Sequence, residues 1–121
     1  MIRHVMLVLA VGCSSTSNAI DAHVDPAVCK ANLEAAIDRT CAVPADCVLV
    51  DSADCCGVVK LGVKSGTQVQ FPPVESQYVA CLACGPRGCQ HADQAEDGSV
   101  PSAGQSIVAT CTAGRCTSIV Q

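Results

Sequence analysis

The sequence predicts a small disulfide-rich α+β domain, with one N-terminal helix and a few short antiparallel strands that include a C-terminal hairpin. The chain has 121 residues, which is enough for one domain. It contains one Phe, one Tyr and no Trp, so the side chains that bury the largest areas are nearly absent. It also contains eleven cysteines. A small domain with so few large side chains usually needs cross-links to offset its conformational entropy.

The cysteines divide into one near the N-terminus and ten further along the chain. Without Cys13 the number is even and sufficient for five disulfides, although spacing alone does not determine their connectivity. The cysteines expected to form these disulfides are Cys29, Cys41, Cys47, Cys55, Cys56, Cys81, Cys84, Cys89, Cys111 and Cys116.

Residues 1–12 have the pattern of a signal peptide. Arg3 and His4 form a short positive segment, and an apolar run of seven residues, Val5 to Val11, follows. This run is too short to span a membrane but fits the apolar region of an export signal. We therefore expect residues 1–12 to be removed from the mature protein.

The four residues Ala10-Val11-Gly12-Cys13 resemble the lipobox of bacterial lipoproteins, although Leu is commoner than Ala at the first position. The resemblance implies cleavage before Cys13 and acylation of that cysteine. Two or more acyl chains would give stable membrane anchoring. Residues 13–24 would then be a lipid-anchored flexible tether, and residues 25–121 the disulfide-stabilised domain.

A second processing route is open. Ser17-Asn18-Ala19 has small residues at the two positions that an ordinary signal peptidase reads. Cleavage after Ala19 would discard Cys13 and give a secreted, soluble protein. Both routes leave ten cysteines, so the cysteine count does not choose between them.

The N-terminal helix is predicted from Asp25, as the N-cap, and Pro26, in the first turn, to about Arg39. Apolar residues and Thr40 share one helical face: Cys29, Leu33, Ala36, Ile37 and Thr40. Phe71-Pro72-Pro73 is expected to break the chain before a short helix. The other predicted elements are strands at 47–51, 58–63 (weakened by Gly62), 106–110 and 116–120, a short helix at 74–84, and an exposed loop at 90–105.

One alternative for the cysteines is a metal or redox site. Cys81, Cys84, Cys89 and His91 have a spacing that could bind zinc. Cys81 and Cys84 also form a CxxC motif, which in redox enzymes opens a helix within a βαβ unit. No βαβ pattern is visible here, so structural disulfides are the favoured interpretation and no metal or other cofactor is expected.

The remaining residues do not suggest catalysis or nucleic-acid binding. No hydrolase, zinc-protease or phosphate-loop motif is present, so no catalytic residue is assigned. Without Arg3, six Lys and Arg remain against eleven Asp and Glu, and the basic residues form no stripe. A small protease inhibitor is an alternative, in which Lys60, Lys64 or Arg87 would be the loop residue that a protease reads.

Cysteine spacing carries a wider resemblance. The chain reads CAVPADCVLVDSADCCG from Cys41 to Gly57 and CTAGRC from Cys111 to Cys116. Behind a lipobox, this arrangement resembles small Cys-rich bacterial lipoproteins of uncharacterised function. The resemblance implies export to the bacterial cell envelope, facing the periplasm or the cell surface. We therefore expect a binding or structural module whose protein or small-molecule partner is unknown.

Overall fold

The computed structural model describes residues 24–86 and 88–121. It confirms the α+β class and the C-terminal hairpin. The elements, in chain order, are α1 (Pro26–Ala36), the 3₁₀ turn η1 (Pro44–Asp46), β1 (Cys47–Ala53), β2 (Val58–Lys64), η2 (Gln68–Gln70), α2 (Phe71–Leu82), β3 (Ile107–Thr112) and β4 (Arg115–Val120). The strands form two separate antiparallel pairs, β1 with β2 and β3 with β4.

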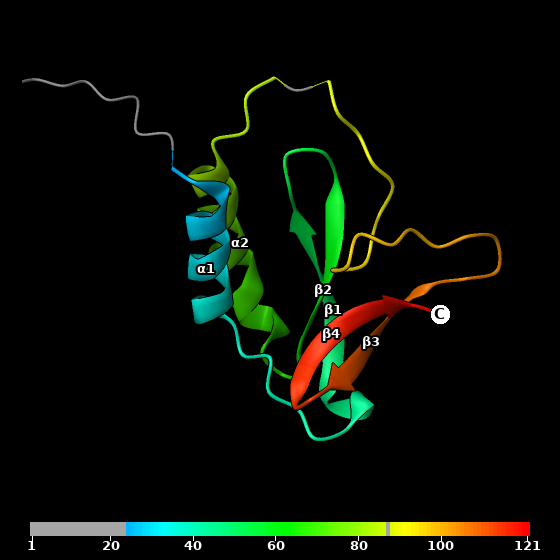
Figure 1. The fold of residues 1–121 in the computed structure, drawn as a ribbon. Coiled ribbons are helices and arrows are strands. Elements are labelled where there is room, and N and C mark those ends of the chain that lie inside the picture. Colours follow the sequence, from blue (N-terminus) through cyan, green and yellow to red (C-terminus); the bar gives the residue numbers. More distant parts are fainter. Residues whose placement is uncertain (1–23, 87) are drawn as a thin grey trace, which may run out of the picture.

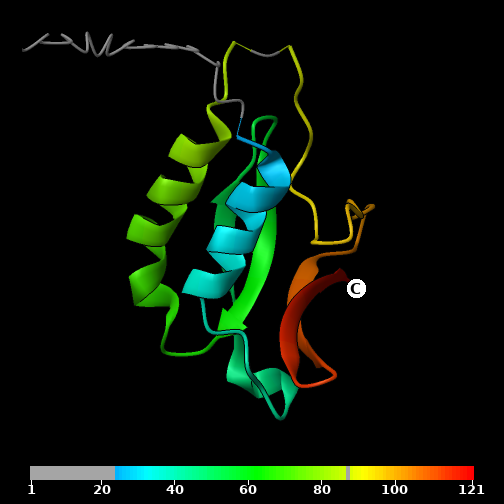
Figure 2. The ribbon, with the colours of Figure 1, turned by 60° about the vertical axis from the view of Figure 1, so that its left-hand side comes forward.

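The first hairpin lies between the helices and the second hairpin. Helices α1 and α2 run side by side on one side of β1 and β2, and β3 and β4 cross on the other side (Figure 1). Figure 2, turned by 60°, shows α1 in front of β1 and β2 with the second hairpin beside them. Leu33, Leu61 and Phe71 form the buried apolar cluster, so the core lies between the helices and the first hairpin.

Helix α1 begins as predicted but ends three residues before Arg39. The Asp25 carboxylate caps it by accepting from the backbone N–H of Ala27 at 2.9 Å. Ile37 is already extended, with φ −114° and ψ 149°. The next backbone groups bond to the strands instead: the carbonyl of Asp38 accepts from Lys64, and that of Arg39 accepts from Cys116. These long-range hydrogen bonds replace the last helical turn, and Thr40 therefore leaves the expected buried face.

The expectation that Phe71-Pro72-Pro73 breaks the chain is wrong, because these residues form the first turn of α2. Proline is tolerated there since the first N–H groups of a helix have no helical partner. The helix ends at Leu82 rather than at Cys84. Ala83 takes a left-handed conformation, with φ 47° and ψ 48°, and closes it.

Five disulfides join the ten cysteines from Cys29 onward. They are Cys29–Cys81 between the helices, Cys41–Cys111 and Cys47–Cys116 between the two hairpin regions, and Cys55–Cys84 and Cys56–Cys89 between the β1–β2 turn and the segment after α2. Neighbouring cysteines do not bond to each other. Cys111 and Cys116 lie opposite each other in the second hairpin, but each forms its disulfide with a cysteine of another segment. Such dense cross-linking is typical of proteins that mature in an oxidising compartment outside the cytosol.

The turn of the second hairpin is tight. Ala113 and Gly114 both have positive φ, 50° and 76°, which is the geometry that two-residue hairpins prefer.

No helix among the described residues is long and apolar enough to cross a membrane.

The segment 90–105 was expected to be an exposed loop, and its middle is not. Ala95 is fully buried, and Gln94 forms a parallel bridge with Val59. The Gln94 carbonyl accepts from the N–H of Lys60 at 2.9 Å. These contacts attach the loop to the free edge of β2. Without them, backbone groups along this edge would lack hydrogen-bond partners from the protein.

Candidate ligand cleft

A cleft of about 190 Å³ lies where α1, α2 and the first hairpin meet. Leu33 of α1, Tyr78 of α2, and Val59 and Leu61 of β2 supply its apolar lining. Three carboxylates also line it, one each from α1, from the end of β1 and from the loop: Glu34, Asp54 and Glu96. Small-molecule sites commonly combine an apolar lining with a few convergent polar groups in this way.

Two of the carboxylates are held by a buried guanidinium. Arg39 is 5% exposed, and its Nη1 donates to Glu34 Oε1 at 2.7 Å. Its Nη2 donates to a carboxylate oxygen of Glu96, and Nε and Nη2 both donate to the carbonyl of Cys116. On the outside, Arg115 donates to Glu34 Oε2 at 2.6 Å. The buried charge of Arg39 is therefore fully paired.

Glu96 is fixed through its other oxygen as well. Oε2 accepts from the backbone N–H of Gly62 at 3.1 Å and from that of Ser118 at 2.9 Å. Glu96 thus links the loop to β2, to β4 and to Arg39. Glu96 lies in the segment 90–105, which the sequence predicts to be an exposed loop, and no local motif marks this residue.

Asp54 is fixed at the turn of the first hairpin. Its Oδ1 accepts from the N–H groups of Cys56 and Gly57, both at 2.7 Å, and its Oδ2 lies 2.7 Å from His91 Nε2. Partial burial opposes ionisation of Asp54, but these hydrogen bonds outweigh it and lower its pKa.

His91 has an oxygen acceptor at each ring nitrogen. Nδ1 lies 2.7 Å from the carbonyl of Ala92, and Nε2 faces Asp54. Only the protonated ring can donate from both nitrogens. The Ala92 carbonyl and then Asp54 therefore raise the pKa of His91.

In the cleft lining, the side chains of Ser52, Tyr78 and Lys30 make no hydrogen bond or ion pair with a described residue. Ser52, near the end of β1, is 3% exposed and lines the cleft. Burial, and next the charge of Asp54, raise the pKa of the Tyr78 phenol and keep it in its neutral form. Lys30 of α1 also lines the cleft and makes no ion pair with a described residue. No sequence motif marks Ser52, because a single serine in a strand is unremarkable.

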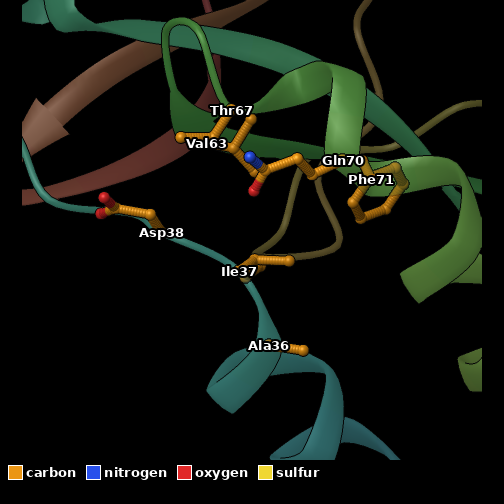
Figure 3. A pocket seen from close by; sticks show the side chains of 7 residues that line it. All are labelled: Ala36, Ile37, Asp38, Val63, Thr67, Gln70 and Phe71. Atoms are coloured by element: carbon orange, nitrogen blue, oxygen red, sulfur yellow. The ribbon is translucent and has the colours of Figure 1, made fainter.

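A second hollow lies between the end of α1 and the start of α2. Figure 3 shows Ile37 and Phe71 at this hollow, with Asp38 pointing away. Its volume is about 20 Å³. That is enough for roughly one water molecule, so this hollow is too small for an organic ligand.

The structure separates the residues of the alternative zinc site. Cys81, Cys84 and Cys89 each bond to a different cysteine outside the motif, and His91 pairs with Asp54. The CxxC pair is likewise divided between two disulfides. Sulfur atoms of Cys41, Cys47 and Cys116 do lie within 4.8 Å of one another. They belong to two neighbouring disulfides, which lack the thiolates that bind metals.

Of the other sequence-predicted residues, Lys60 and Lys64 do not line the cleft. Cys13, with the whole segment 1–23, and Arg87 fall outside the described residues. Lys60 and Lys64, expected in loops, are strand residues of β2. Lys60 is paired with Asp51 at 2.6 Å and Asp93 at 3.3 Å, which leaves its ammonium engaged within the protein.

Comparison with known proteins gives no relative: no family model, no curated protein and no solved structure matches this chain.

Proposed function

We propose that this protein is an exported, lipid-anchored and non-enzymatic binding module. Its domain, from residue 25 on, is locked by five disulfides and presents the cleft beside α1. Two observations support the proposal: the ten described cysteines bond only to one another, which leaves Cys13 without a disulfide partner, and Cys13 is the last residue of the lipobox-like Ala10-Val11-Gly12-Cys13. A single residue, Gly12, separates Cys13 from the apolar run Val5 to Val11.

The anchor has a chemical reason. The sulfur of Cys13 would receive a diacylglyceryl group, and the new amino terminus a further acyl chain. Each buried methylene contributes about 0.8 kcal/mol, so two or more chains hold a protein at a membrane stably. Residues 13–24 would link the lipid to α1, which begins at Pro26.

The cleft supports binding better than catalysis. Glu34, Asp54 and Glu96 are each held in ion pairs and hydrogen bonds with the protein. A general acid or base has to reach the substrate with an available proton or lone pair. Within residues 24–86 and 88–121, no base is hydrogen-bonded to the hydroxyl of Ser52 or Tyr78 that would activate it as a nucleophile.

The test is processing of the full chain in a bacterial host, with Cys13→Ser compared against Ala19→Arg. The first change removes the acylated sulfur, and the second blocks cleavage after Ala19. We expect Cys13→Ser to lose lipid labelling and to leave the membrane fraction, whereas Ala19→Arg stays lipidated. Intact mass should show two acyl chains or more and a start at Cys13. The anchor would be excluded if Cys13→Ser stayed in the membrane fraction and the wild-type protein began after Ala19.

A further inference from the structure

We propose that the cleft between α1 and the first hairpin binds a neutral, polyhydroxylated small molecule of monosaccharide size. This inference rests on the proposed binding function and names the chemical class of its ligand. Polar side chains in the cleft without a described hydrogen-bond partner support it, as does the balance of charge around them.

Ser52 is the strongest indication of a ligand. The residue is 3% exposed, yet its hydroxyl makes no hydrogen bond to a described residue. No fully enclosed side-chain nitrogen or oxygen among the described residues lacks a partner. The Ser52 hydroxyl must therefore be reached from the cleft that it lines. A ligand hydroxyl that enters the cleft can therefore form a hydrogen bond with this oxygen in a largely shielded position.

The neighbouring groups offer both donors and acceptors. Tyr78, like Ser52, has a hydroxyl that can donate and accept, and the Lys30 ammonium can donate. The carboxylate oxygens of Asp54 and Glu96 are fixed by their protein partners but accept along several directions. Hydroxyl groups on a ligand match this mixture, since each can donate to a carboxylate and accept from an ammonium.

The charged groups around the cleft disfavour a strongly charged ligand. Each carboxylate of the lining already has a basic partner: Arg39 and Arg115 contact Glu34, Arg39 contacts Glu96, and the His91 imidazole contacts Asp54. An anionic ligand would have to approach three fixed carboxylates. The ammonium of a cationic ligand would compete with the Lys30 ammonium for those carboxylates. A neutral ligand avoids both costs.

Size and shape set the upper limit. A cavity of about 150 Å³ accepts a six-membered ring, and this cleft measures about 190 Å³. It therefore fits one sugar or cyclitol ring. It is too small for a nucleotide, and it could hold only the terminal unit of an oligosaccharide. Leu33, Leu61 and the Tyr78 ring can cover the C–H face of such a ring.

The test is NMR titration of the isotope-labelled, oxidised and detergent-solubilised full protein with D-glucose and myo-inositol. Glucosamine and glucuronate serve as charged analogues of the same size. We expect the two neutral probes to shift the amide signals of Ser52, Ala53 and Leu61, and the charged analogues to bind about tenfold more weakly. Equal or tighter binding of a charged analogue, or no shift with either neutral probe, would overturn the inference.

Two hydroxyl deletions test the site itself. Ser52→Ala and Tyr78→Phe each remove one oxygen and keep the packing, and each should weaken binding about fivefold or more. Ser102→Ala, in the exposed loop before β3, is the control and should bind normally. If neither deletion weakens binding, the site lies elsewhere. None of these results changes the lipidation of Cys13, so failure here leaves the membrane anchor standing and removes only the ligand class.

Discussion

Arg39 and Glu96 are 57 positions apart in the chain and form an ion pair in the interior, with 4% of the Arg39 side chain exposed. Arg39 follows α1, and Glu96 belongs to the loop that precedes the second hairpin. The pair also holds Glu34 and the carbonyl of Cys116, so it connects the helix, the loop and β4. No disulfide between described residues joins α1, the loop 90–105 or β4 directly to another of these three elements.

Replacement of Arg39 by Met should destabilise the protein strongly. The change leaves Glu96 and Glu34 without their buried partner, which typically costs about 3–5 kcal/mol. The measurement is urea unfolding of the oxidised protein. Arg115→Met is the matched control, because it removes another partner of Glu34 at a site where 51% of the side chain is exposed. An exposed pair contributes about 1 kcal/mol or less. Equal losses in the two variants would contradict the role assigned to Arg39.

Stability should depend on pH through Asp54 and His91. The pKa of His91 is raised above its ordinary 6.5, so its contribution is complete below that value and is lost as pH rises through the folded pKa. The pKa of Asp54 is lowered below 3.8, so its contribution is present above that value and is lost as pH falls through the folded pKa. The pair therefore stabilises most between about pH 4 and 6.5.

His91→Gln provides the test, since glutamine can hydrogen bond but carries no charge. We expect its melting temperature to fall further below that of the wild type at pH 5 than at pH 9. The imidazole signals of the wild type, followed by NMR, should titrate above 6.5. A difference in melting temperature that is the same at both pH values would show that the charge of His91 contributes nothing.

Local patterns predicted the elements well and the site poorly. The capping pair Asp25-Pro26 placed the start of α1, and the Thr112–Arg115 turn placed the C-terminal hairpin. Nothing local marks Ser52 or Glu96, because distant segments supply the partners of Glu96 and the lining of the cleft around Ser52. The end of α1 was missed for the same reason, since hydrogen bonds to β2 and β4 determine it.

Cysteine arithmetic predicted participation in disulfides but not their pairing. Cys111 and Cys116 face each other across β3 and β4, yet Cys41 and Cys47 are their partners. Adjacent Cys55 and Cys56 bond to Cys84 and Cys89. Pairing depends on how the hairpins and helices pack, which spacing along the chain does not contain.

Gly62 was expected to weaken β2, and its neighbours give it a different role. A Cβ at this position would lie 2.5 Å from the carbonyl oxygen of Thr117, where the two hairpins cross. Gly62→Ala should therefore separate the hairpins and cost about 1–3 kcal/mol. Gly85→Ala is the control, because no atom lies within 4 Å of its added Cβ. Chemical denaturation of both variants checks the prediction, and a neutral Gly62→Ala would refute the close contact.

Full reduction should unfold the protein at room temperature without denaturant. The five disulfides span 29 to 70 residues, and each bridge of this kind typically contributes about 2–5 kcal/mol against a total stability of about 5–15. Phe71 and Tyr78 are the only aromatic residues of the chain, so burial cannot replace several bridges.

Helix α1 should be lost together with the bridges, because eleven residues form a marginal helix in water. Circular dichroism in excess reductant measures this directly. The double variant Cys29→Ala/Cys81→Ala is the control, since it releases the helices from each other and keeps four disulfides. It should stay folded, with a lower melting temperature. If the fully reduced protein keeps its spectrum and a cooperative melt, then the cluster of Leu33, Leu61 and Phe71 holds the fold without covalent help.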